Sequence, residues 1–226
     1  MCEKQQEQIV PQKAKLLAAE SLRHSDHSGW FEVLYAEASG DASQVPWASL
    51  AVHPYLHNWL ERYLPNGEGR SALVIGCGLG DDAQALQERG FKVTAFDISP
   101  TGIAWCQKRF PDSPVNYLVA DLFALPQKWH GAFDFVFESR TIQALPLSVR
   151  SKVIESIGLL VAVEGTLLVL SWFRHTDTEP EGPPWPVSER ELAQFQTLGF
   201  QEIRRDFFVE DEIDTVTQLW VEYLNI

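Results

Sequence analysis

A short apolar run followed by three closely spaced glycines and two acids constrains this chain more than any other feature. The run Ala72–Ile75 leads into Gly76-Cys-Gly-Leu-Gly80 and then Asp81 and Asp82, and the next residues have helical spacing. Strand, glycine turn and helix in this order form pockets for nucleotide-type ligands, because glycines let the backbone turn tightly and let a ligand approach closely. The residues expected at this ligand are Gly76, Cys77, Gly78 and Gly80.

Strands and helices alternate along the chain from this turn onward. Further strands are expected at Phe91–Phe96, Val115–Val119, Phe133–Phe137 and Thr166–Trp172. Helices are expected at Asp82–Arg89, from Ser99 to about Arg109, at Ser148–Val161, and from the capping box Ser188–Glu191 to about Leu198. Such alternation predicts an α/β fold with a doubly wound, mostly parallel, Rossmann-like sheet.

The last two β-rich runs predict an antiparallel C-terminal hairpin that completes a seven-stranded sheet. They are Glu202–Val209 and Val216–Leu224, joined by an acidic turn. A turn is also expected at Val163–Gly165, before the fifth strand.

The chain is expected to form one domain, residues 30–226, after an N-terminal extension, residues 1–29. Residues 30–64 are predicted as a helical cap, with helices at Trp30–Ala38 and from Pro54, and residues 65–226 as the α/β core. A helix is expected within the extension at Lys13–Leu22, after Pro11.

Acids follow the strands at the edge where a doubly wound sheet binds its ligand. Asp97 lies 17 positions after Gly80, where a carboxylate can accept hydrogen bonds from both hydroxyls of a ribose. Asp121, with Leu122 beside it, can lie at an adenine amine, and Glu138 follows the fourth strand. The cofactor-binding residues expected here are Asp97, Ile98, Asp121, Leu122 and Glu138. The alternative for Asp97 and Asp121 is that each caps a local turn.

The spacing of the glycines favours S-adenosylmethionine (SAM) over a nicotinamide dinucleotide. The dinucleotide fingerprint is G-x-G-x-x-G, whereas this chain has G-x-G-x-G followed by Asp81 and Asp82. Two acids at a helix N-terminus are poor neighbours for a pyrophosphate, which binds exposed N–H groups there. They tolerate a zwitterionic, cationic ligand.

Composition disfavours several other kinds of partner. The formal net charge of −13 disfavours nucleic acid and anionic lipid. No apolar run is long enough to cross a bilayer, and the polar N-terminus has no signal-peptide core. The three cysteines form no disulfide or zinc pattern, and the histidine pairs His24/His27 and His53/His57 lack a third ligand. The chain is therefore expected to be cytoplasmic and metal-free. A monomer is favoured, although the sequence leaves the oligomeric state open.

Four stretches make the chain resemble the class I SAM-dependent methyltransferases, and within them the thiopurine and halide/thiol methyltransferase group. These stretches are Gly29-Trp30 with Pro46-Trp47 and Pro54, Leu73–Asp82 through Ser99, Phe133–Glu138 with Thr141–Pro146, and Gly182-Pro-Pro-Trp-Pro-Val-Ser188. The resemblance implies that Trp30 and Trp47 cover the cofactor and that Asp97 holds its ribose. The chain departs from the group's pattern at Glu138-Ser-Arg140, at Val163-Glu-Gly165 and after Trp47.

The function expected from these features is methyl transfer from SAM to a small molecule, most simply a thiol or another soft nucleophile, by in-line displacement. An O- or N-methyltransferase is the alternative, and it needs a base, for which Glu138 and His175 are candidates. Arg140, and less so Arg174, can attract an anionic acceptor. The Trp172–Trp185 loop is expected to border the acceptor pocket as a lid. A SAM-binding protein without transfer activity is the remaining alternative.

Overall fold

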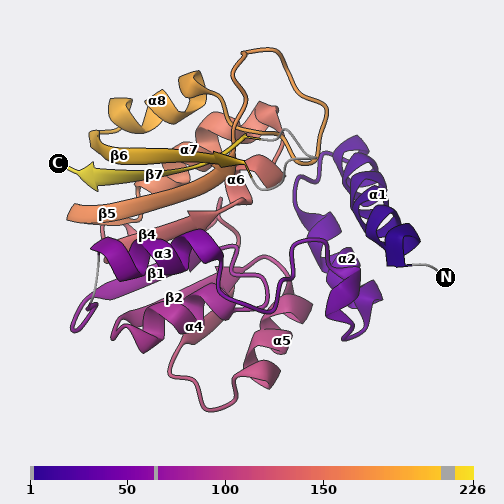
Figure 1. The fold of residues 1–226 in the computed structure, drawn as a ribbon, viewed down its shortest axis with the longest axis horizontal. Coiled ribbons are helices and arrows are strands. Elements are labelled where there is room, and N and C mark those ends of the chain that lie inside the picture. Colours follow the sequence, from indigo (N-terminus) through magenta and orange to yellow (C-terminus); the bar gives the residue numbers. More distant parts are fainter. Residues whose placement is uncertain (1–2, 64–65, 210–216) are drawn as a thin grey trace.

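Seven strands form one sheet in the order β3-β2-β1-β4-β5-β7-β6 (Figure 1). The computed structural model describes residues 3–63, 66–209 and 217–226. The strands are β1 (Ser71–Ile75), β2 (Lys92–Asp97), β3 (Asn116–Val119), β4 (Phe133–Ser139), β5 (Val161–Trp172), β6 (Phe200–Val209) and β7 (Thr217–Asn225). Strands β1 to β5 pair in parallel, and β7 pairs antiparallel with both β5 and β6. The predicted doubly wound sheet with a C-terminal hairpin is confirmed.

Helices cover both faces of this sheet (Figure 1). They are α1 (Glu3–Arg23), α2 (Gly29–Ala38), α3 (Pro54–Tyr63), α4 (Asp81–Glu88), α5 (Pro100–Arg109), α6 (Thr141–Ala144), α7 (Arg150–Gly158) and α8 (Glu189–Thr197). Alternate side chains of β1 point to opposite faces, as the period of a strand requires. Leu73 packs with residues of α7 and α8, whereas Val74 packs with residues of α3, α4 and α5.

A separate cluster holds the N-terminal helices beside the ends of the strands (Figure 1). Ala14 and Ala18 of α1 pack with Leu34 and Tyr35 of α2, and Leu79 of the glycine turn joins the same cluster. The segment expected as an extension therefore contributes a helix that packs on the cap.

Three elements differ most from their expected extents. Helix α1 continues through Pro11 and ends at Arg23, since its apolar face packs on α2. Helix α7 spans Arg150–Gly158, so it is shorter at both ends than the expected Ser148–Val161. Strand β5 begins at Val161, and the turn expected at Val163–Gly165 is an irregularity inside it, where Glu164 has φ +61°.

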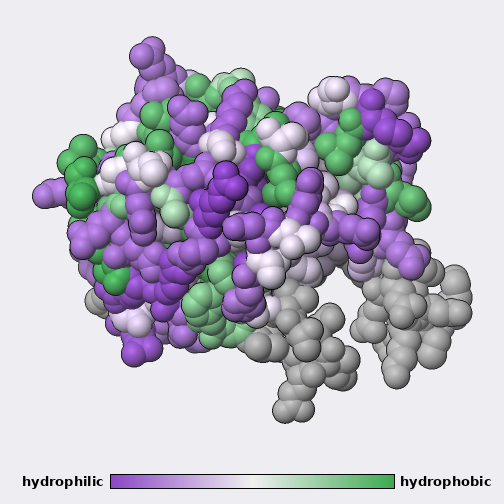
Figure 2. All heavy atoms as spheres, turned by 90° about the horizontal axis from the view of Figure 1, so that it is seen from above, coloured by the Kyte–Doolittle hydropathy of each residue, from purple (hydrophilic) through white to green (hydrophobic). Residues whose placement is uncertain are grey.

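The surface is mostly polar on the face that Figure 2 shows, where hydrophobic residues form separate patches. In the described part of the chain, no helix has the length and apolar character needed to span a bilayer. The acidic turn expected between β6 and β7 lies outside the described residues.

Candidate functional site

A pocket of about 400 Å³ lies at the carboxyl ends of the parallel strands. The strand order reverses between β1 and β4, which is where doubly wound sheets bind ligands. Loops after β1 to β5 contribute to its walls, and residues of α1 and α2 and of the segment before α3 close it. The expected residues that line the pocket are Trp30, Trp47, Gly76, Cys77, Gly78, Gly80, Asp97, Ile98, Asp121, Leu122 and Arg140.

The backbone of the glycine turn takes a form that other residues rarely adopt. Gly76, Gly78 and Gly80 have φ of +57°, +56° and +90°. A Cβ on Gly76 would lie 2.5 Å from the Thr141 hydroxyl, and a Cβ on Gly80 would lie 2.7 Å from the Tyr117 hydroxyl. These glycines therefore let the chain turn where neighbouring side chains leave no room for a side chain.

Cys77 of the turn faces the pocket as a protonated thiol. A hydrogen bond with the Cys106 thiol, together with burial, raises the pKa of Cys77 well above its ordinary value. The Cys106 thiol in turn lies 3.1 Å from the Gly78 carbonyl oxygen. Since the thiolate is the nucleophilic form, Cys77 is suited to a packing role rather than to covalent catalysis.

Asp97 ends β2, and its side chain holds the backbone of the glycine turn. Its carboxylate accepts hydrogen bonds from the backbone N–H of Gly78 at 3.0 Å and of Ser99 at 2.9 Å. The side chain lines the pocket although the residue is only 7% exposed. Burial raises the pKa of Asp97 to about 6. Each carboxylate oxygen keeps a lone pair for a ligand, so the geometry suits two neighbouring hydroxyls such as those of a ribose.

Asp121 and Leu122 follow β3 and form the next part of the wall. Asp121 is exposed, and its carboxylate accepts a hydrogen bond from the Phe123 N–H at 2.8 Å. This is the turn-capping contact that was the alternative for this residue. Leu122 is buried and apolar, which suits the face of a flat ring.

Aromatic side chains close the side of the pocket opposite the sheet. Trp30 stacks on Phe31 with ring centroids 3.9 Å apart, and Trp47 meets Trp30 edge-on at 5.9 Å. The Trp47 indole N–H donates to the Tyr35 hydroxyl at 2.7 Å. The expected aromatic cover therefore exists, and α2 supplies two members of it, Phe31 and Tyr35, that the sequence did not single out.

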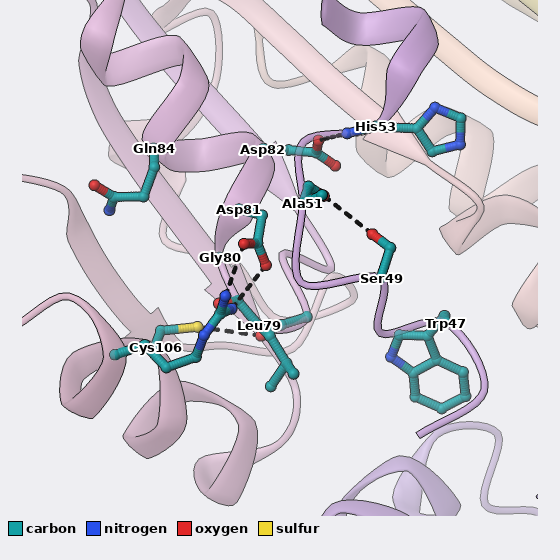
Figure 3. A network of polar contacts seen from close by, with 12 residues as sticks. Trp47, Ser49, Ala51, His53, Leu79, Gly80, Asp81, Asp82, Gln84 and Cys106 are labelled. Atoms are coloured by element: carbon teal, nitrogen blue, oxygen red, sulfur yellow. Dashed lines mark hydrogen bonds and ion pairs between the residues drawn. The ribbon is translucent and has the colours of Figure 1, made fainter. Parts of the chain in front are cut away.

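The two acids after the glycine turn line the pocket, and each also bonds to another part of the protein (Figure 3). Asp81 forms a bidentate ion pair with Arg109, with both contacts at 2.7 Å. Asp82 accepts a hydrogen bond from the backbone N–H of His53 at 2.7 Å, and burial raises the pKa of Asp82 to about 6. Because Arg109 balances the charge of Asp81, repulsion of a pyrophosphate is weaker than the sequence suggests. Asp97 suits a ribose, which both kinds of ligand carry, so the G-x-G-x-G spacing is the feature that favours SAM.

Glu138 does not reach the pocket, in contrast to its expected role in catalysis and cofactor binding. It is fully buried in β4, and its Oε1 accepts a hydrogen bond from the Ile142 N–H at 2.9 Å. The next residues, Ser139 and Arg140, line the pocket instead. Glu138 therefore positions the start of α6 from behind the wall.

Burial raises the pKa of Glu138 to about 7 from an ordinary value of 4.5. Between these two pH values the folded chain binds more protons than the unfolded chain, so the free energy of unfolding falls as pH rises from 4.5 to 7. Above pH 7 the full penalty from Glu138 is present. At pH 8 we expect Glu138→Gln to have a free energy of unfolding roughly 1–3 kcal/mol larger than that of wild type. At pH 4.5 we expect no such gain. Chemical denaturation at the two pH values measures this.

Glu155→Gln is the matched control, since Glu155 is exposed on the neighbouring helix α7. It is expected to leave stability unchanged at both pH values. An equal effect of Glu138→Gln at pH 4.5 and pH 8 would show that Glu138 ionises normally in the folded chain.

A second part of the pocket lies at the ends of β4 and β5. Arg140 and His53 line it together with Trp172 and the prolines Pro183 and Pro184. Burial, and then the charge of Arg140, lower the pKa of His53 to about 4, so its imidazole is neutral near pH 7. In the sequence, His53 is notable for its spacing to His57 as a possible metal-binding pair. In the structure His57 is exposed.

The other candidates of the Trp172–Trp185 loop do not line the pocket. Arg174 forms an ion pair with Glu191 at 2.8 Å and donates to the Pro186 carbonyl. His175 is exposed and packs edge-on against Phe173. Trp185 is buried, and its backbone N–H donates to the backbone carbonyl of Gln143 at 2.7 Å. The loop therefore borders the pocket through Trp172 at one end and the two prolines near the other.

The sheet order, with a glycine turn after β1, is the fold of the SAM-dependent methyltransferases. Solved methyltransferases share this fold. N-methyltransferase NodS from Bradyrhizobium japonicum, in complex with S-adenosylhomocysteine, superimposes with a TM-score of 0.67 at 18% identity, over 86% of this chain and 97% of that one. A Burkholderia thailandensis 1,6-didemethyltoxoflavin-N1-methyltransferase gives a TM-score of 0.64 at 17% identity, over 87% and 88%.

The chain belongs to the thiopurine S-methyltransferase family, whose model matches residues 39–217. A probable thiol methyltransferase 2 of Arabidopsis thaliana is 30% identical over 190 residues, which cover 80% of this chain and 77% of that protein. A 2-heptyl-1-hydroxyquinolin-4(1H)-one methyltransferase of Mycobacteroides abscessus is 26% identical, over 68% and 67% of the two chains. The protein is thus a SAM-dependent methyltransferase of small molecules.

Proposed function

We propose that the pocket binds SAM along the ends of β1 to β3 and transfers its methyl group to a small thiol. The observation that carries this proposal is the buried Asp97 carboxylate, which is held against the glycine turn and lines the pocket. In this placement Asp97 holds the ribose, Asp121 and Leu122 adjoin the adenine, and Trp30 and Trp47 cover the ligand. Bound SAM supplies a methyl group on a sulfonium, which a nucleophile takes by in-line displacement.

A thiol is favoured because, in the part of the chain that the structure describes, neither base expected for an O- or N-methyltransferase, Glu138 or His175, lines the pocket. Glu138 lies behind the wall, and the pKa of His53 is lowered to about 4. A thiolate is present at neutral pH without a positioned base, whereas a hydroxyl or protonated amine must lose a proton first. The aromatic and proline walls exclude water and align the acceptor. The Arabidopsis relative named as a thiol methyltransferase agrees with this choice.

Incubation with methyl-labelled SAM and a panel of acceptors tests the proposal. The panel contains thiophenol, sulfide, iodide, phenol and aniline, and label is expected to transfer to the thiols. Transfer to phenol or aniline alone would support the O- or N-methyltransferase instead. Binding of S-adenosylhomocysteine without transfer to any acceptor would support a binding protein.

We also propose that the enzyme acts in a reducing compartment such as the cytoplasm, as a monomer and without nucleic acid. Cys77 and Cys106 carry free thiols that contact one another, which supports a reducing environment. The net charge of −13 argues against binding to phosphate backbones.

A further inference from the structure

Gln143 is a buried polar side chain in the pocket wall with one end fixed by the protein. It lies on α6, is 4% exposed and lines the pocket. Its Oε1 accepts hydrogen bonds from the Ser171 hydroxyl at 2.9 Å and from the Trp172 backbone N–H at 2.5 Å. Because a backbone N–H can only donate, the atom that faces it must be the amide oxygen. The direction of the Gln143 amide is therefore determined by its bonding partners.

The other end of the amide is left for a ligand. Among residues 3–63, 66–209 and 217–226, no acceptor bonds to the Gln143 Nε2 group. Buried amide groups almost always have a partner, from the protein, from water or from a ligand. The Gln143 backbone is also fixed, since its carbonyl accepts the Trp185 N–H. The donor is thus held rigidly in the wall with its hydrogen-bonding capacity unused.

Gln143 lies too far along the sheet to serve the ribose. It bonds to the end of β5, whereas Asp97 ends β2, and strands β1 and β4 lie between them. Three strand spacings amount to about 14 Å. Arg140, Trp172 and the two prolines of the loop line the pocket at the same β4–β5 end, so Gln143 belongs to the acceptor part of the wall.

We propose that Gln143 determines acceptor specificity by donating a hydrogen bond from Nε2 to the molecule that receives the methyl group. The inference rests on the proposed function. The favoured acceptor carries an unprotonated oxygen or ring nitrogen in addition to the atom that is methylated. A carboxylate suits this place best, because Arg140 adds a positive charge to the same wall. An acceptor without such a group leaves the Gln143 donor buried and unpaired, which disfavours its binding.

Steady-state kinetics with thiophenol and the three positional isomers of mercaptobenzoate test this role. For wild type, kcat/KM for the best isomer is expected to exceed that for thiophenol at least about 10-fold. Gln143→Glu keeps an oxygen for Ser171 and Trp172 but replaces the donor with an acceptor. Gln143→Met removes both the donor and the acceptor of the amide without adding a charge. Both variants are expected to bring the ratio to within about 3-fold, with affinity for S-adenosylhomocysteine unchanged.

Gln196→Glu is the matched control, since it makes the same change at an exposed position of α8 and should leave the ratio as in wild type. A wild-type enzyme that methylates thiophenol as well as every mercaptobenzoate would overturn the role of Gln143 and leave the proposed function intact. The same holds if both variants keep the wild-type ratio. Wild type that binds S-adenosylhomocysteine but methylates no thiol would overturn the proposed function, and the inference with it.

Discussion

Asp97→Ala is expected to bind S-adenosylhomocysteine about 100-fold more weakly than wild type, a loss of ~2.7 kcal/mol. The change removes the carboxylate that we place at the ribose, and hydrogen bonds to a charged group contribute about 1.5–3 kcal/mol. It also releases the N–H of Gly78 and of Ser99, so the glycine turn loses its support. Titration calorimetry measures the affinity, and an unfolding curve shows whether the variant is folded.

Asp121→Ala provides the comparison for this result. Asp121 lines the same pocket, but it is exposed, and its carboxylate bonds to the Phe123 N–H alone among the described residues. Its loss is expected to weaken binding no more than a few-fold. If Asp97→Ala bound as tightly as wild type, the ribose would not lie at the end of β2.

Gly80→Ala is expected to have the second largest effect, a loss of roughly 2–5 kcal/mol in the free energy of unfolding together with weaker cofactor binding. At φ +90° an alanine is strained, and its Cβ would lie 2.7 Å from the Tyr117 hydroxyl. That ring cannot move freely, since the Tyr117 hydroxyl bonds to Gln84 and to the Gly80 carbonyl. Chemical denaturation measures the stability.

Gly40→Ala is the control that distinguishes the strain of a positive φ from the close contact of the new Cβ with a neighbouring side chain. Gly40 has φ +91°, almost the same as Gly80, yet a Cβ there would meet nothing within 4 Å. The free energy of unfolding of Gly40→Ala should fall by about 1–2 kcal/mol, which is the cost of the positive φ alone. Equal losses in the two variants would mean that Tyr117 does not constrain the glycine turn.

The glycine turn and Asp97 could be predicted because their signals are local. A strand, closely spaced glycines and a helix start lie within one short stretch, and Asp97 directly ends the next strand. The capping box Ser188–Glu191 was predictable for the same reason, and it is observed at the start of α8. Each of these features depends on backbone conformation near its own position in the chain.

Features that depend on packing between distant segments could not be predicted in this way. The sequence predicts that Glu138 follows its strand as Asp97 does, but β4 continues to Ser139. Only the register of the folded sheet and the placement of α6 decide whether a side chain faces the pocket. Helix α1 continues through Pro11, at a cost of about 3 kcal/mol, because packing on α2 offsets it. Gln143 could be noted in the Thr141–Pro146 motif, yet its free donor is visible only once Trp172 lies beside it.

Titration calorimetry of the wild-type chain with S-adenosylhomocysteine, run beside NADH, tests the central claim most directly. Binding of one S-adenosylhomocysteine per chain, with no heat from NADH, is the result that the G-x-G-x-G turn and the family of the chain predict. Binding of NADH with no binding of S-adenosylhomocysteine would contradict it.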